Sequence, residues 1–199
     1  MVTVDTQPSA RAPASHQRMT DKPTRRRTFL MLAVAIAAVA AAAIGFAVFG
    51  KDDEQTLRAG KAVVITPEAL RTFVKDAPVP VFWAGRRPNT ELEYTETSDK
   101  RSFVRYLTGS ADAGDPRPVF VSIVTYPRPE ALAELKRVAK RKGVVSAPAP
   151  GGGLSTYDKA KPLSVYVAYP RQSVLVEVYA PKAGDARSIV RSGNVRPVR

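Results

Sequence analysis

The chain has no cysteine and only one histidine, and these two shortages exclude many familiar sites. Without cysteine there is no disulfide, no lipid-modified cysteine, no thiolate metal site and no cysteine nucleophile. The single histidine, His16, lies near the N-terminus, so the rest of the chain offers no imidazole for a serine triad or for zinc. The sequence therefore predicts a domain held by packing alone, with no cofactor, no metal and no catalytic activity.

An apolar run without a charged residue extends from Phe29 to Phe49. As a helix it would be about 31 Å long, which matches the hydrocarbon core of a bilayer. Three arginines at 25–27 precede the run and acidic residues at 52–54 follow it, so the positive-inside rule places the N-terminus in the cytoplasm. We expect a single-pass protein of the cell membrane whose C-terminal domain is extracytoplasmic.

A cleaved export signal is the alternative interpretation of this run. Arg26 and Arg27 fit a twin-arginine signal, and Ala38-Val39-Ala40 offers small residues for cleavage. The apolar run continues past that point, beyond the 7 to 15 residues typical of a secretory signal. An uncleaved signal-anchor is therefore favoured, with an exported soluble domain as the alternative.

The composition divides the chain into four segments. Residues 1–28 are a basic tail with few large apolar side chains, so they are expected to be disordered. Residues 29–50 form the transmembrane signal-anchor helix, and 51–61 form a linker. Residues 62–199, about 138 in number, are long enough for one extracytoplasmic domain with its own core.

The charge is strongly positive, at +13 for the whole chain. After residue 50 there are 25 Lys and Arg against 16 Asp and Glu, a net +9. Outside a cell this favours anionic lipid or acidic wall polymer as a partner and argues against nucleic acid, although a merely solubilising surface is the alternative. Five of the cations crowd the end of one predicted helix: Lys136, Arg137, Lys140, Arg141 and Lys142.

Two helix starts share the sequence Pro-Glu-Ala-Leu, at Pro67 and at Pro129. The first has Thr66 in the N-cap position and proline at the first helical position. Helical spacing predicts buried faces made of Leu70, Phe73, Val74 and Ala77 in the first helix, and of Leu132, Leu135 and Val138 or Ala139 in the second.

Alternating apolar residues predict a hairpin of strands 91–97 and 102–107 and another of strands 163–169 and 173–179. The more continuously apolar stretch 119–126 should be a central strand. Shorter signals predict strands at 79–84 and 195–198 and a helix at 185–192, whereas the Pro- and Gly-rich stretch 146–153 is expected to be a flexible loop. The order predicts a single α+β domain, mainly antiparallel sheet with two or three packed helices.

Several blocks of the outer domain carry a family resemblance. PVFWAG, TSDKRSFVRYL, GDPRP, TYPRP, VEVY and SGNVRPV occur between Pro80 and Val198, in that order. They resemble the signature blocks of a family of uncharacterised single-pass membrane-anchored proteins from high-GC Gram-positive bacteria. The resemblance implies the same topology and a shared outer domain, but no activity or ligand. The family has glycine in the hairpin turn where this chain has Lys100.

Within those blocks we identify a candidate ligand site. Trp83, Arg86 and Arg87 follow one predicted strand, while Tyr126 and Arg128 end another, just before a helix. If the two strands run parallel in one sheet, an aromatic ring and two or three guanidiniums meet at one sheet end and can hold a carboxylate, a phosphate or a sugar acid. The alternative is that Trp83 and Tyr126 are core residues and the arginines belong to loops.

Carboxylates offer the remaining catalytic chemistry. Glu91 and Glu93 point to the same side of a predicted strand, and Glu96 is nearby. A glycosidase needs two carboxyl groups at a defined separation in a cleft, whereas this pair is expected on a solvated face. The sequence thus predicts a membrane-anchored binding or interaction domain that contacts an anionic envelope component or a membrane protein partner; a carbohydrate hydrolase is the less favoured alternative.

Overall fold

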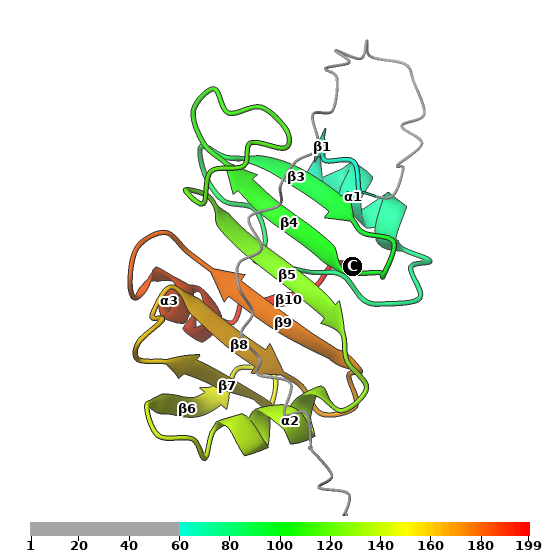
Figure 1. Ribbon diagram of the computed structural model, residues 1–199. Coiled ribbons are helices and arrows are strands. Elements are labelled where there is room, and N and C mark those ends of the chain that lie inside the picture. The colour runs from blue at the N-terminus through cyan, green and yellow to red at the C-terminus, as the bar shows by residue number, and fades with distance from the viewer. Residues whose placement is uncertain (1–59) are drawn as a thin grey trace, which may run out of the picture. The chain divides into compact units, whose positions relative to one another are not determined.

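The described part of the chain is organised around one large antiparallel sheet (Figure 1). The computed structural model describes residues 60–199. Neighbouring strands of this sheet are all antiparallel. In order across the sheet, the strands are β1 (Val63–Ile65), β3 (Glu91–Glu96), β4 (Ser102–Leu107), β5 (Val121–Pro127), β9 (Val174–Tyr179), β8 (Ser164–Ala168), β7 (Gly153–Asp158) and β6 (Val144–Ala149).

Three helices and a two-stranded sheet complete the fold of residues 60–199. They are α1 (Pro67–Val74), α2 (Ala131–Val138), α3 (Asp185–Arg191) and the pair β2 (Phe82–Trp83) and β10 (Arg196–Pro197). The predicted α+β class, mainly antiparallel sheet with packed helices, is confirmed. Within this part of the chain no helix is long and apolar enough to cross a membrane. The predicted span 29–50, the tail 1–28 and most of the linker 51–61 lie outside the described residues.

The two faces of the large sheet are covered by different elements. One face packs against α1, α3 and the β2–β10 pair and forms the main core. The other face carries α2, whose Ala131 and Leu135 pack on Ala168 and Leu175 in a smaller core. As a result the sheet is covered on both sides near its centre, and all six residues of β9 are buried.

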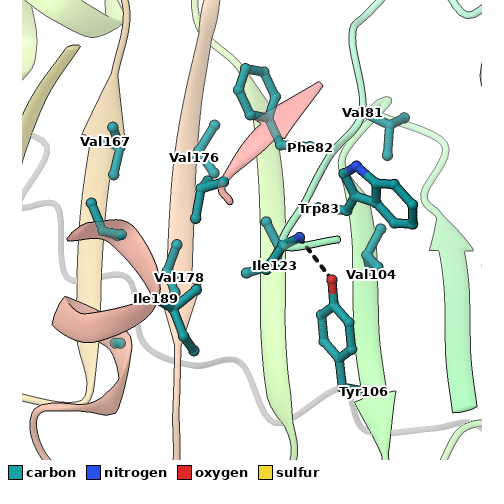
Figure 2. Packing of buried hydrophobic residues seen from close by; sticks show 14 of the residues in the cluster. Val81, Phe82, Trp83, Val104, Tyr106, Ile123, Val167, Val176, Val178 and Ile189 are labelled. Atoms are coloured by element: carbon teal, nitrogen blue, oxygen red, sulfur yellow. Dashed lines mark hydrogen bonds between the residues drawn. The ribbon is translucent and has the colours of Figure 1, made fainter. Parts of the chain in front are cut away.

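The main core is filled by aliphatic side chains of the central strands and by the aromatic residues of β2 (Figure 2). Val104, Ile123 and Val176 are completely buried. Phe82 stacks on the ring of Tyr169 at a centroid distance of 5.5 Å. Burial of one such side chain contributes about 1.5–3 kcal/mol, so this face supplies much of the stability.

The helix predictions are confirmed in position and corrected in their buried faces. Thr66 caps α1, because its hydroxyl oxygen accepts a hydrogen bond from the amide of Ala69 at 3.1 Å. In α1 only Leu70 and Val74 are buried, and Phe73 is 43% exposed against the edge of the Tyr94 ring. In α2 the buried residues are Ala131 and Leu135, so Leu132 and Val138 are only half-buried.

The predicted hairpins are confirmed as β3–β4 and β8–β9. The stretch predicted to be central is β5, which has three strands on one side and four on the other. The predicted edge strand near the C-terminus is β10, which pairs with β2 and not with the large sheet. In the β3–β4 turn, Lys100 has φ 63°, the left-handed conformation that glycine adopts most easily.

The expectation of a flexible loop at 146–153 is wrong, since this stretch belongs to the hairpin β6–β7. Pro148 is tolerated because β6 is the edge strand, where a missing N–H group need not break the sheet. Gly151 and Gly152 turn the chain with φ of +82° and +77°. Gly153 leaves no room for a side chain, because a Cβ there would lie 2.8 Å from the Tyr169 ring.

Substitution of Lys100 tests the left-handed turn. Lys100→Ala and Lys100→Gly both remove the ion pair of Lys100 with Glu96, but only glycine also removes the Cβ from the strained backbone. We expect Lys100→Gly to be more stable than Lys100→Ala by about 1 kcal/mol in urea denaturation, the reverse of the usual order inside strands and helices. An alanine variant as stable as the glycine variant would contradict the turn geometry.

Candidate functional site

The five residues predicted to form one ligand site lie in separate places. The prediction assumed that 79–84 and β5 were parallel strands of one sheet, but β2 pairs with β10 and lies over the main-core face. The Phe82 amide donates to the Thr125 hydroxyl at 3.1 Å, so the next residue, Tyr126, points to the opposite face. Trp83 is a core residue, only 2% exposed, with the Arg71 guanidinium 5.1 Å from its ring.

Tyr126 belongs to a cluster of hydroxyl groups around a buried carboxylate. Glu177 is 3% exposed and accepts hydrogen bonds from Tyr126 at 2.7 Å, Ser164 at 2.7 Å and Tyr166 at 3.2 Å. None of the ion pairs in residues 60–199 involves Glu177. Burial, reinforced by this carboxylate, raises the pKa of Tyr126 and Tyr166 well above the usual value for tyrosine. The cluster ties β5, β8 and β9 together and uses the Tyr126 hydroxyl.

Arg128 is half-buried where the chain leaves β5 for α2. Its backbone amide donates to the carbonyl of Ser173 at 2.8 Å, which continues the pairing of β5 with β9 past the strand end. Arg128 does not line the cleft that contains Arg86 and Arg87. The structure brings only those two arginines together.

Arg86 and Arg87 line a cleft of about 600 Å³ between β1, the start of α1 and the start of β3, which we call the arginine cleft. The Arg86 guanidinium donates a hydrogen bond to the Glu68 carboxylate, and the Arg87 guanidinium lies 5.6 Å from the centre of the Tyr106 ring. A local backbone hydrogen bond, followed by the guanidiniums of Arg86 and Arg71, lowers the pKa of Glu68. Glu91 also lines the cleft, so its two cations are balanced by two nearby carboxylates.

Tyr106 holds the backbone segment that leads from β2 to the two arginines. Its hydroxyl accepts a hydrogen bond from the Ala84 amide at 2.7 Å, drawn in Figure 2, and donates to the Gly85 carbonyl at 3.0 Å. Burial raises the pKa of Tyr106 to about 12, so the hydroxyl stays protonated at any physiological pH. Gly85, the second residue after β2, turns the chain with φ 73°. The arginine cleft is therefore built on a fixed loop.

The expected solvated face for Glu91 and Glu93 is wrong for Glu93, which is 1% exposed. Its carboxylate accepts from Arg105 at 2.8 Å and from the Gly114 amide at 2.6 Å. Arg105 in turn donates to the Asp115 carbonyl at 2.6 Å and lies over the ring of Phe120. The loop 108–120 thus folds over this part of the sheet, a long-range contact that strand alternation does not reveal.

The surroundings of Glu93 do not suit the paired carboxyl groups of a glycosidase. Both oxygens of Glu93 are engaged by Arg105 and Gly114, and Glu93 does not line the arginine cleft, whereas Glu91 does. Glu93 and Glu177 lie on strands three places apart in the sheet, which corresponds to roughly 14 Å. Paired carboxyl groups in glycosidases are about 5–9.5 Å apart. Residues 60–199 contain no group of three or more His, Cys, Asp or Glu side chains arranged to hold a metal.

A second cationic surface lies at the far edge of the sheet. The chain after α2 meets the β7–β8 turn, where the Lys159 amide donates to the Gly143 carbonyl at 2.9 Å. This contact joins two basic segments that are distant in sequence. We call the resulting group the basic end; its members, all exposed, are Lys140, Arg141, Lys142, Lys159 and Lys161.

The basic end has one carboxylate beside it, that of Asp158, which accepts a hydrogen bond from the Ala160 amide at 2.8 Å. No ion pair among residues 60–199 includes any of its five members. The described residues carry 23 Lys and Arg against 13 Asp and Glu, a net +10. The cations after α2 were recognisable in the sequence. Lys159 and Lys161 join them only because β6, β7 and β8 pair in order and bring the β7–β8 turn beside residues 140–142.

Removing the cation beside Glu93 should be severely destabilising. Arg105→Gln leaves a buried carboxylate without its partner, and we expect a loss of about 3–5 kcal/mol in the free energy of unfolding. The double variant Glu93→Gln/Arg105→Gln should recover part of that loss. Arg117→Gln is the matched control, because its ion pair with Asp115 is exposed on the arginine side, and it should cost at most about 1 kcal/mol. Equal losses for Arg105→Gln and Arg117→Gln in urea denaturation would contradict this assignment.

Comparison with protein families, with curated proteins and with solved structures finds no match to this chain. The geometry of the described residues is therefore the basis for assigning a function. It offers two cationic surfaces of different character: the arginine cleft, where Arg86 is paired with Glu68, and the basic end, whose five cations have no ion-pair partner among residues 60–199.

Proposed function

We propose that this protein is a membrane-anchored extracytoplasmic binding domain that uses the basic end to hold an anionic polymer of the cell envelope. The observation that carries the proposal is the gathering of five exposed cations without an ion-pair partner among residues 60–199. Lysine ammonium groups are compact charges that contact phosphate or carboxylate without a fixed geometry. A repeating polyanion can satisfy several of them at once.

The basic end lies at the edge of the large sheet opposite the first described strand. β1, where the tether would enter the domain, and β6, beside the basic end, are the two edges of the sheet. Seven strand spacings of about 4.8 Å place these edges roughly 34 Å apart.

A protein partner is the second class of ligand for such a domain, and exposed apolar surface would support it. The large apolar residues that are exposed within 60–199 are Val64, Phe73 and Val119, at 40%, 43% and 49%. They belong to β1, to α1 and to the loop before β5, so they do not come from one continuous element. Charge is the stronger feature of this surface.

The anchor is tested by fractionation of the host cell. We expect the full-length chain, identified by intact mass, to remain in membranes after an alkaline wash, because an apolar helix of about 31 Å is held by the bilayer core. A chain that begins near Ala41 and is found in the soluble exported fraction would instead establish a cleaved signal.

Polymer binding is tested with the full chain in nanodiscs of phosphatidylcholine, using inorganic polyphosphate and polygalacturonate as probes and neutral dextran as the blank. The triple variant Lys142→Gln/Lys159→Gln/Lys161→Gln should bind polyphosphate more weakly. The slope of log K against log salt should become shallower by about 2, at roughly 0.7 for each lost contact.

The matched control removes three exposed charges elsewhere, in Lys75→Gln/Arg191→Gln/Arg199→Gln. It should leave the slope within about 0.5 of the parent chain, because a localised site does not depend on total charge. Equal effects of the two triple variants would mean a diffuse attraction and would overturn the assignment to the basic end. Loss of polyphosphate binding when phosphatidylglycerol replaces phosphatidylcholine in the discs would assign this surface to lipid, because the anionic headgroups would then occupy the basic end.

A further inference from the structure

We propose that a pocket beside α2 binds the apolar chain of a single-chain anionic amphiphile, with its charged group held by Lys136. The pocket has a volume of about 410 Å³ and lies between α2 and the β6–β7 hairpin. Its wall includes Leu132, Lys136, Ser146, Pro148, Gly152 and Leu154. We call it the α2 pocket. The negative charge assigned to the ligand rests on the proposed function, whereas the apolar chain rests on the pocket itself.

The lining is suited to an apolar chain. Leu132 and Leu154 are half-buried and also pack against the small core under α2, so the α2 pocket is an open extension of that core. A hydrocarbon chain lying there would complete the burial of both leucines, at about 25 cal/mol for each Å² removed from water. The volume lies within the range of sites for small ligands.

The hairpin wall is set by a close contact of its backbone, and the helix wall by two buried side chains. Gly153 packs so closely on Tyr169 that a Cβ would lie 2.8 Å from the ring, and this contact sets the position of the turn. By contrast, α2 has only two buried residues, Ala131 and Leu135, and its N-cap residue Glu130 makes no capping hydrogen bond through its side chain. The helix wall is therefore held by the packing of these two residues on Ala168 and Leu175 and not by a side-chain cap.

Lys136 is the only charged residue in the wall of the α2 pocket, and it is exposed. It lies four residues after Leu132, hence on the same side of the helix and one turn further on. Lys140, a member of the basic end, follows four residues later. An amphiphile with its apolar chain against Leu132 therefore meets the positive charge of Lys136 one helical turn further on, which is the complement of a phosphate or carboxylate head.

The experiment uses the full chain in phosphatidylcholine nanodiscs with a photoactivatable lysophosphatidylglycerol as probe. We expect the cross-links to map by mass spectrometry to α2 and to the β6–β7 hairpin. Lysophosphatidylcholine of the same chain length should compete about 10-fold more weakly, because its head carries no net negative charge. A fatty acid that competes as well as lysophosphatidylglycerol shows that a carboxylate head suffices, and one that does not shows that the site selects phosphate.

Two variants and one control separate the α2 pocket from general attraction. Lys136→Glu should weaken the cross-linking by about 10-fold, equivalent to 1.4 kcal/mol. Ser146→Phe fills the pocket from an exposed strand position and should abolish cross-linking with an unchanged melting temperature. Arg137→Glu is the matched control, since this exposed neighbour on α2 does not line the pocket, and it should have less than about a two-fold effect.

Cross-links that map outside α2 and the β6–β7 hairpin would overturn the proposal. So would equal losses in Lys136→Glu and Arg137→Glu, because that result means diffuse charge attraction. Failure of the α2 pocket is distinguishable from failure of the basic end: polyphosphate has no apolar chain, so Ser146→Phe should leave its binding unchanged. A loss of polyphosphate binding in Ser146→Phe would also contradict the proposal, since it would show that the two sites are not separate.

Discussion

Burial of β9 along its whole length is the constraint on which the rest of the described structure depends. A strand at the middle of a sheet projects side chains to both faces, so both faces must be covered. The main core, with α1, α3 and the β2–β10 pair, covers one face, and α2 covers part of the other. The second face is the more polar one, and its buried groups have to find partners there.

Two buried carboxylates on this second face are stabilised by neighbouring side chains. Glu93 is neutralised by Arg105 under the loop 108–120, and Glu177 is satisfied by three hydroxyl groups from β5 and β8. A buried charge left alone would cost several kcal/mol, so these contacts are requirements of the fold. They also occupy Glu93 and Tyr126, two residues that the sequence offered as candidates for chemistry or binding. The candidate binding surfaces that remain are the basic end, the α2 pocket and the arginine cleft.

The candidate site was only partly predictable for reasons of geometry. Arg86 and Arg87 are neighbours in sequence and line the same cleft, so the sequence was sufficient to group these two residues. Trp83 and Tyr126 were grouped through an assumed parallel pairing, and the pairing of β2 with β10 places them on opposite sides of the sheet. The basic end needed Lys159 to meet Gly143, a contact between residues that no local pattern connects.

The sequence by itself determined the hairpins β3–β4 and β8–β9, the positions of the three helices and the α+β class, because alternation, capping and helical spacing are local properties. The cysteine-free composition and the net positive charge are likewise properties of the sequence alone. Only the tertiary structure decided that 146–153 is a hairpin, that Glu93 is buried and that two basic segments meet. Each of these depends on which strand lies beside which, and strand order is set by long-range packing that no single segment encodes.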